Sequence, residues 1–261
     1  MQRVVGFVFL IVVFCSCQEV INVDLNSASP RLVVEGDITT KPGPYLFKLS
    51  RTTNFFDNNI FAPEVGASVI INDNAGSIDT LKEILSGIYV TKKISGTIGN
   101  TYNLSIYTQG QKYSASAKMM DTVHIDSLTY TLGTGKNPQY RLACAFQDPL
   151  GIGNYYAFRT YKNRAILGDV VNNRIVTDKI TNGGWFRNTF RNDAIQLSDT
   201  IKVELLSVDK ATYDYYNTLR ATLNSGSPFS TPPANPVTNL SNGALGFFGA
   251  YAVTSRSVVI N

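Results

Sequence analysis

Short runs in which apolar and polar residues alternate, each closed by turn-forming residues, fill the chain from residue 30 to residue 118. Residues 31–38, 45–50 and 102–107 show the two-residue period of strands that bury one face. No helical period competes with it in this stretch. About seven short strands separated by turns are what an immunoglobulin-like fold needs. The sequence therefore predicts an immunoglobulin-like β-sandwich over residues 30–120.

The rest of the chain, residues 121–261, is expected to form a second β-rich domain with one short helix. Its strands are expected at residues 125–132, 140–147, 154–161, 195–208 and 244–260. Asp209 can cap a helix near residues 209–224, because the side chains that follow it recur at helical spacing. Residues 166–192 are dense in Asn, Gly and Asp and are expected to be irregular. The predicted fold class is thus mostly β.

The composition is that of a globular β-protein. Hydrophobic residues make up 44% of the chain and charged residues only 16%, so there is enough apolar material for a large core. The net charge of +4 falls by one if a leader containing Arg3 is removed. So small and dispersed a charge lacks the basic footprint of nucleic-acid-binding proteins, and we expect no nucleic acid partner.

The first seventeen residues have the pattern of an export signal. Arg3 precedes an apolar run over residues 4–14, and a small residue then precedes Cys17. The run is about half of the roughly 20 residues that a membrane span requires, which favours a processed signal over an anchor helix. We expect a lipoprotein signal peptide over residues 1–16, acylation of Cys17, and a tether over residues 17–29. The alternative is an ordinary cleaved signal with an accidental cysteine.

Cys144 is the one cysteine that remains if the leader is removed and Cys17 carries lipid, so no internal disulfide is expected. It shares a strand face with Leu142 and Phe146. This surrounding predicts a buried apolar thiol rather than a nucleophile.

Residues that could carry catalysis are scarce. His124 is the only histidine, and neither a nucleophile elbow nor a zinc-binding His-Glu-x-x-His motif accompanies it. Residues 72–76 and 56–59 faintly resemble calcium loops, but they lack the distal Glu of such loops and are better explained as hairpin turns. We expect no catalytic residue, no bound metal and no cofactor.

An aromatic and basic cluster is the main candidate for contact with a ligand or partner. Its members are Trp185, Phe186, Arg187, Phe190 and Arg191, and Phe229 in a proline-rich loop is a further candidate. Aromatic rings and arginine forks could stack on a sugar, a carboxylate or a partner protein. The alternative is an ordinary hairpin whose aromatic rings pack inward while the arginines are solvated.

Several short pieces of the chain occur in a distinctive order and spacing. They are residues 30–36 (PRLVVEG), 43–45 (GPY), 65–69 (VGASV), 125–128 (IDSL), 148–151 (DPLG) and 245–248 (LGFF). Across nearly its whole mature length the chain resembles DUF4249, a family of Bacteroidetes lipoproteins. The resemblance implies a lipid-anchored outer-membrane protein of a Gram-negative bacterium, usually found beside a TonB-dependent transporter barrel. It implies no known catalytic residues.

Two further features bear on the envelope location. The acidic run that follows the lipid cysteine in surface-exposed relatives is reduced here to Glu19 and Asp24. The choice between an outward and a periplasmic position therefore stays open, with the surface favoured. Four Asp-Ser/Thr-apolar triplets resemble the O-glycosylation acceptor of Bacteroidetes, although so short a pattern also recurs by chance. Their acceptors are Thr80, Thr122, Ser127 and Thr200.

These observations lead to three hypotheses of function. The first is a non-catalytic binding or accessory subunit on the outer membrane, associated with a TonB-dependent transporter. The alternative is a structural or adhesive surface protein, for which sandwich domains alone would suffice. The third is an enzyme acting on surface polysaccharide, which needs two carboxylates that converge in an aromatic-lined cleft.

Overall fold

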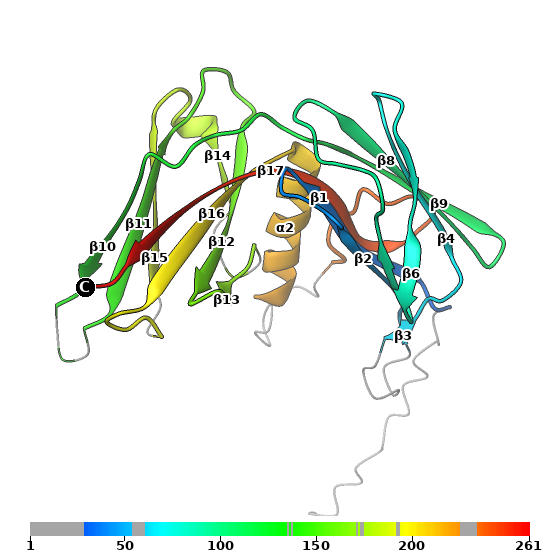
Figure 1. Ribbon diagram of the computed structural model, residues 1–261, viewed down its shortest axis with the longest axis horizontal. Helices are drawn as coiled ribbons and strands as arrows, with labels where there is room; N and C mark the ends of the chain where they lie inside the picture. The colour runs from blue at the N-terminus through cyan, green and yellow to red at the C-terminus, as the bar shows by residue number, and fades with distance from the viewer. Residues whose placement is uncertain are drawn as a thin grey trace, which may run out of the picture.

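The computed structural model describes residues 29–53, 61–134, 136, 138–170, 172, 175–191, 194–224 and 234–261. Its strands form two β-sandwiches that lie side by side, and one long strand runs from one into the other (Figure 1). We call them the first and the second sandwich. The prediction of a mostly β chain with an N-terminal sandwich, a second β-rich region and a short helix is confirmed.

The first sandwich contains the strands nearest the N-terminus. They are β1 (Leu32–Thr39), β2 (Leu46–Arg51), β3 (Ala62–Pro63), β4 (Ser68–Asp73), β5 (Ile78–Thr80), β6 (Lys82–Leu85), β7 (Ile88–Val90), β8 (Thr101–Thr108) and β9 (Gln111–Lys118). One layer has the order β1-β2-β7-β6, with β3 beside β2, and the other has the order β5-β4-β8-β9. Alternate side chains of β8, such as Tyr102, Leu104 and Ile106, fill the space between the layers.

The second sandwich follows the same principle. Its strands are β10 (Ser127–Leu132), β11 (Tyr140–Gln147), β12 (Tyr155–Lys162), β13 (Ala165–Gly168), β14 (Val176–Thr177), β15 (Trp185–Arg191), β16 (Thr200–Val208) and β17 (Leu245–Val259). One layer has the order β13-β12-β16-β17, with β14 also beside β12, and the other has the order β10-β11-β15. Phe146, Phe158 and Leu205 belong to the core that the strands share.

The expectation that residues 166–192 are irregular is wrong. The segment contains most of β13, all of β14, the short 3-10 helix η2 (Asp178–Ile180) and β15. β15 pairs with β11 along its whole length. β13 and β14 are too short to show a period in the sequence. In β15 the buried Asn188 lies between Phe186 and Phe190 on the same face, so a polar residue interrupts the apolar alternation.

Strand β17 belongs to both sandwiches. Its first half pairs in parallel with β1, from Val33 opposite Leu245 to Thr39 opposite Tyr251. Its second half pairs antiparallel with β16, so that a single sheet crosses the molecule. A division at residue 120 is therefore incomplete, because residues 245–251 supply a strand of the first sandwich. Nothing in the local pattern of β17 indicates which strand it would pair with, since a parallel partner can come from anywhere in the chain.

Helix α2 (Lys210–Leu223) lies where the two sandwiches meet (Figure 1). The Asp209 carboxylate accepts a hydrogen bond from the backbone N–H of Thr212 at 2.8 Å, which caps the first turn as expected. Tyr213 and Tyr216 pack against a small core that includes Leu206 and Tyr251. Within the described ranges, no helix combines the length and the hydrophobicity that crossing a membrane requires.

Two glycines of β17 permit the close packing at this junction. Gly246 has φ +86°, and a Cβ built on it would lie 2.0 Å from the Val34 carbonyl oxygen. A Cβ on Gly249 would lie 2.0 Å from the hydroxyl of Tyr251, so that ring lies along its own strand over the glycine. Any larger residue at position 246 would push β1 and β17 apart. The pairing of the two strands therefore depends on a missing side chain.

This dependence is testable by substitution of two glycines with nearly the same backbone angle. Gly99 has φ +83°, and a Cβ there would meet nothing within 4 Å. We expect Gly99→Ala to lower the free energy of unfolding by about 1 kcal/mol, the cost of the left-handed conformation alone. Gly246→Ala should lower it by at least about 3 kcal/mol, because the contact with β1 adds to that cost. Urea denaturation measures both, and equal losses would contradict the argument.

Candidate functional site

A groove lies between helix α2 and the sheet that crosses the molecule. It encloses about 460 Å³. Its walls come from β1, β2, β12, β17 and α2, so both sandwiches contribute. We call it the α2 groove. The residues that line it are Glu35, Asp37, Leu46, Lys48, Arg159, Tyr215, Tyr216, Leu219, Phe247 and Tyr251, with Gly36 between the two acids.

One wall of the α2 groove is aromatic. The ring of Tyr215 stacks on that of Phe247, with centroids 4.7 Å apart and planes 21° apart. Tyr216 meets Tyr215 edge-on at 5.1 Å. Such a wall presents flat apolar faces beside phenolic hydroxyls, the combination that suits a ligand with one apolar and one polar side.

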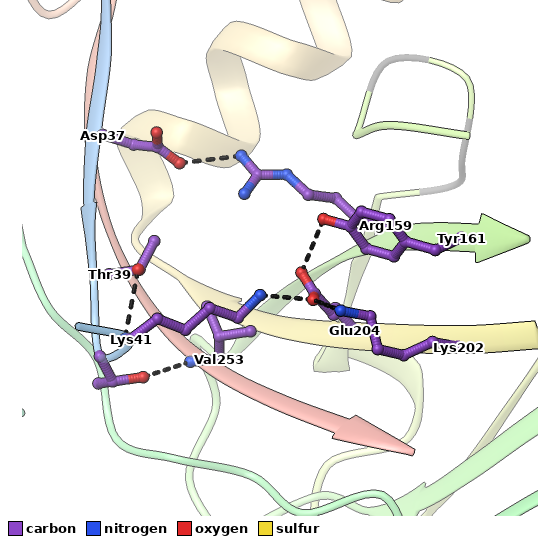
Figure 2. A network of polar contacts seen from close by, with 9 residues as sticks. Asp37, Thr39, Lys41, Arg159, Tyr161, Lys202, Glu204 and Val253 are labelled. Carbon is purple, nitrogen blue, oxygen red and sulfur yellow. Dashed lines mark hydrogen bonds and ion pairs between the residues drawn. The ribbon is translucent and has the colours of Figure 1, made fainter. Parts of the chain in front are cut away.

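An ion pair at the base of the groove joins the two sandwiches. Arg159 on β12 donates from Nη2 to the carboxylate of Asp37 on β1 at 2.9 Å (Figure 2). Burial by itself would lower the pKa of Arg159, but the charge and hydrogen bond of Asp37 outweigh it and raise that pKa. The guanidinium also lies 5.9 Å from the ring centre of Tyr251. Arg159 therefore keeps its positive charge at neutral pH.

The tyrosine hydroxyls at the groove are protonated at neutral pH. Burial raises the pKa of Tyr216 to about 12 and that of Tyr251 well above its ordinary value. These hydroxyls can donate and accept hydrogen bonds, but they do not supply a phenolate nucleophile or base. The tyrosines of the groove therefore offer a ligand their ring faces and hydrogen bonds.

A second cross-sandwich network surrounds Glu204, which is fully buried. Its carboxylate binds Lys41, which follows β1, and Lys202 at 2.7 Å, and it accepts a hydrogen bond from the Tyr161 hydroxyl at 3.1 Å (Figure 2). Burial by itself would raise the pKa of Glu204. The hydrogen bonds and charges of the two lysines outweigh it, so the pKa lies below its ordinary value.

The charged residues that line the groove are paired with one another, and the Glu204 network, which lies outside the lining, is also compensated. Asp37 faces Arg159, and Glu204 faces two lysines that extend toward solvent. At the rim, Glu35 and Lys48 lie 3.7 Å apart on neighbouring strands. A neutral polar ligand fits such a surface better than an ion, since a single added charge would have to displace an existing partner.

The structure divides the predicted aromatic and basic cluster between two faces of β15. Trp185 is 64% exposed, and Arg187 also faces solvent. Phe186 instead stacks on Phe146, with centroids 5.2 Å apart and planes 6° apart. Phe190 is buried against Phe158. The cluster therefore does not form a single surface. Cys17, Phe229 and the side chain of Arg191 lie outside the described residues.

The four candidate glycosylation positions differ in access. Thr80 and Thr200 are exposed, whereas Thr122 and Ser127 are half-buried. The acid before Thr80 has a structural role, because the buried carboxylate of Asp79 accepts backbone N–H groups of Lys92 and Ile94 at 2.7 and 3.0 Å. The Asp of a short Asp-Thr pattern can therefore have a purely structural role, the hydrogen bonding of a loop backbone.

The remaining candidates from the sequence are a cysteine, a histidine and a turn that resembles a calcium loop. Cys144 is fully buried, which confirms the predicted buried thiol, and burial raises the pKa of that thiol to about 12. His124 is exposed. The turn at residues 72–76 is stabilised by the Asp73 carboxylate, which accepts from the N–H groups of Ala75 and Ser77. In the part of the chain that the structure describes, no three His, Cys, Asp or Glu side chains gather as metal ligands would.

Sequence reasoning missed the residues of the groove. Arg159, which lines the groove, and Glu204, which belongs to the second network, did carry a usable signal. Both are charges placed inside apolar strand runs, Phe158–Tyr161 and Val203–Leu206. A charge on a buried strand needs a partner, and the partner of each comes from the other sandwich. The aromatic residues of α2 and β17 gave no such signal in the sequence, because only the tertiary fold brings these elements together.

The comparisons place the chain in a family. The pattern of a family described as "Domain of unknown function (DUF4249)" matches residues 18–257. The chain belongs to the DUF4249 family. No curated protein matches it in sequence. Among solved structures, the crystal structure of chicken CNTN1 FN1-FN3 domains is similar to this chain. The alignment covers 90% of this chain and 69% of the chicken chain, with 8% sequence identity and a TM-score of 0.26.

The Glu204 network predicts a pH-dependent stability. Because its pKa is lowered in the folded state, Glu204 stabilises the fold above its ordinary value of 4.5, and the contribution is lost as the pH falls through the lowered pKa. We expect Glu204→Gln to reduce the free energy of unfolding by about 1–3 kcal/mol at neutral pH, since the two lysines can turn partly toward water. The reduction should shrink below pH 4.5.

Chemical denaturation across a pH series measures this. Glu35→Gln is the matched control, because Glu35 is an exposed acid whose pair with Lys48 should contribute less than about 1 kcal/mol. A loss in Glu204→Gln that equals the control, or one that grows at low pH, would show that the lysines do not stabilise the carboxylate.

Proposed function

We propose that this chain is a lipid-anchored, non-catalytic binding protein of a bacterial outer membrane, and that it works beside a TonB-dependent transporter. The observation that carries the proposal is the N-terminal pattern: an apolar run over residues 4–14 ends three residues before Cys17. The DUF4249 match begins at residue 18, directly after that cysteine. A thioether-linked lipid there, with a further acyl chain on the freed amine, holds a protein stably on a bilayer.

The α2 groove supports a binding role. It is concave, it is formed by both sandwiches, and it combines the stacked pair Tyr215–Phe247 with hydroxyls and compensated charges. Sites for small molecules have this mixture of apolar walls and a few fixed polar groups. We assign the groove a neutral ligand with a flat apolar face and hydroxyl groups, which is the chemistry of a sugar ring.

The family resemblance supports the proposed association with a transporter, which would give the groove a role. A protein held at the membrane by its N-terminus could hold a ligand next to a barrel that imports it. The effective concentration that tethering provides would raise the rate of transfer without any need for tight binding.

The anchor is tested by substitution of two neighbouring cysteines. We expect the native protein to fractionate with the outer membrane and its intact mass to include acyl chains on Cys17. Cys17→Ser should remove the acyl mass and abolish recovery in the outer-membrane fraction, because the hydroxyl cannot form the thioether. Cys15→Ser, the control within the expected leader, should leave both unchanged. An unacylated native protein, or one that washes into the soluble fraction, would refute the anchor.

The partner is tested by detergent extraction and pull-down. The native chain should recover a TonB-dependent barrel, and recovery without any barrel would contradict the association.

Native mass spectrometry of the same material tests whether a small molecule is bound in the α2 groove. Leu219→Trp should displace a retained neutral molecule because the larger ring fills the groove. Leu223→Trp, one turn further on the same helix and 63% exposed, should retain it. Equal retention by both variants would exclude the groove as the site.

A further inference from the structure

A second cavity lies at the open edge of the second sandwich, between η2, β14 and β15. It encloses about 430 Å³. The start of helix α2 also reaches it through Tyr213, whereas the α2 groove is lined by later residues of that helix. We call it the edge cavity. Its lining includes Val176, Lys179, Thr181, Phe186, Arg187 and Asn188.

Two polar atoms in the edge cavity have no partner. Among the residues described, Asn188 Nδ2 and Thr181 Oγ1 are the buried side-chain atoms that make no hydrogen bond, and both residues line this cavity. Asn188 is only 6% exposed and lies on the inward face of β15. A buried amide without a partner destabilises a fold, so native proteins rarely keep one without a use. The amide and the hydroxyl can both donate to a ligand oxygen.

The wall beside these donors is apolar. One face of the Phe186 ring is covered by Phe146, and the ring also lines the cavity. Val176 is a buried side chain of the same core and lines the cavity from β14. An apolar or aromatic body could therefore lie on Phe186 while its polar end reaches Asn188.

The charges at the edge cavity are of one sign. Lys179 and Arg187 are exposed residues of its lining, and the lining that the structure describes includes no carboxylate. The nearest acid in sequence, Asp178, is fully buried, and its carboxylate accepts from the backbone N–H groups of Gly153 and Asn154 at 2.9 and 3.0 Å. The two cations therefore favour a ligand that carries a negative charge.

We propose that the edge cavity binds a small amphipathic carboxylic acid. Its carboxylate accepts hydrogen bonds from Asn188 Nδ2 and the Thr181 hydroxyl, and its apolar body lies on Phe186. Lys179 and Arg187 offset the negative charge. The site is separate from the α2 groove, so it does not depend on the sugar-like ligand or on the transporter. It also gives a role to Phe186 and Arg187, which the sequence marks as candidates although they lie on different faces of β15.

Calorimetric titration of the purified full chain with three probes tests the proposal. Phenylbutyrate, phenylbutanol and phenylbutylamine share one apolar body and differ in the end group. We expect the acid to bind, the alcohol to bind about tenfold more weakly, and the amine not to bind, because charge-assisted hydrogen bonds are the difference. Raising the salt concentration should weaken binding of the acid and leave the alcohol unaffected.

Two variants locate the site. Asn188→Leu replaces the amide by an apolar side chain of similar size, and Thr181→Val keeps the shape of threonine without its hydroxyl. Each should weaken binding of phenylbutyrate about tenfold, since each removes one donor to a charged group. The control is Arg141→Gln, an exposed arginine on β11 that does not line the cavity, and it should bind as the wild type does. Melting curves verify that all three remain folded.

Three results would overturn the proposal. They are the absence of saturable binding of phenylbutyrate, equal affinity for the acid and the alcohol, and unchanged affinity in both Asn188→Leu and Thr181→Val. None of them bears on the α2 groove, because the groove variants at residues 219 and 223 are measured with a different ligand.

Discussion

The parallel pairing of β1 with the first half of β17 is the interaction on which the rest of the structure depends. Without it β1 would be an edge strand paired with β2 alone, and the two sandwiches would be joined only by connecting loops. With it, Asp37 and Lys41 come within reach of Arg159 and Glu204. The pairing requires that Gly246 has no side chain, and the α2 groove exists because helix α2 then covers the face of the joined sheet.

Most of the strands could be predicted from the sequence because their periods are local. β8, with Tyr102, Leu104 and Ile106 on one face, and helix α2, with its Asp209 cap, are examples. The residues of the groove are different. Tyr215 and Phe247 belong to segments whose contact depends on the parallel partner of β17, and no local pattern encodes that partner. Buried charges were the one available clue, and they indicate that a partner exists without identifying it.

Glu204 and Asn188 exemplify two ways of treating a polar group inside a β-sandwich. Around Glu204 every charge is satisfied by the protein itself, which stabilises the junction and leaves little for a ligand to gain. At Asn188 a buried donor has no protein partner, and the residue lines a cavity beside an apolar ring, so a ligand that supplies the missing oxygen gains a hydrogen bond the protein lacks. A polar group whose hydrogen bonds are all made within the protein is typical of a structural contact. A donor without a protein partner is typical of a binding site.

The shared strand also affects when the chain can fold. Residues 245–251, which complete the first sandwich, are made more than two hundred residues after their partner β1. The first sandwich therefore keeps an open strand edge throughout synthesis and closes only when the end of the chain arrives, a contact of very long sequence separation that is slow to form. A chain exported while it is still being synthesised would therefore cross a membrane before its first sandwich is complete.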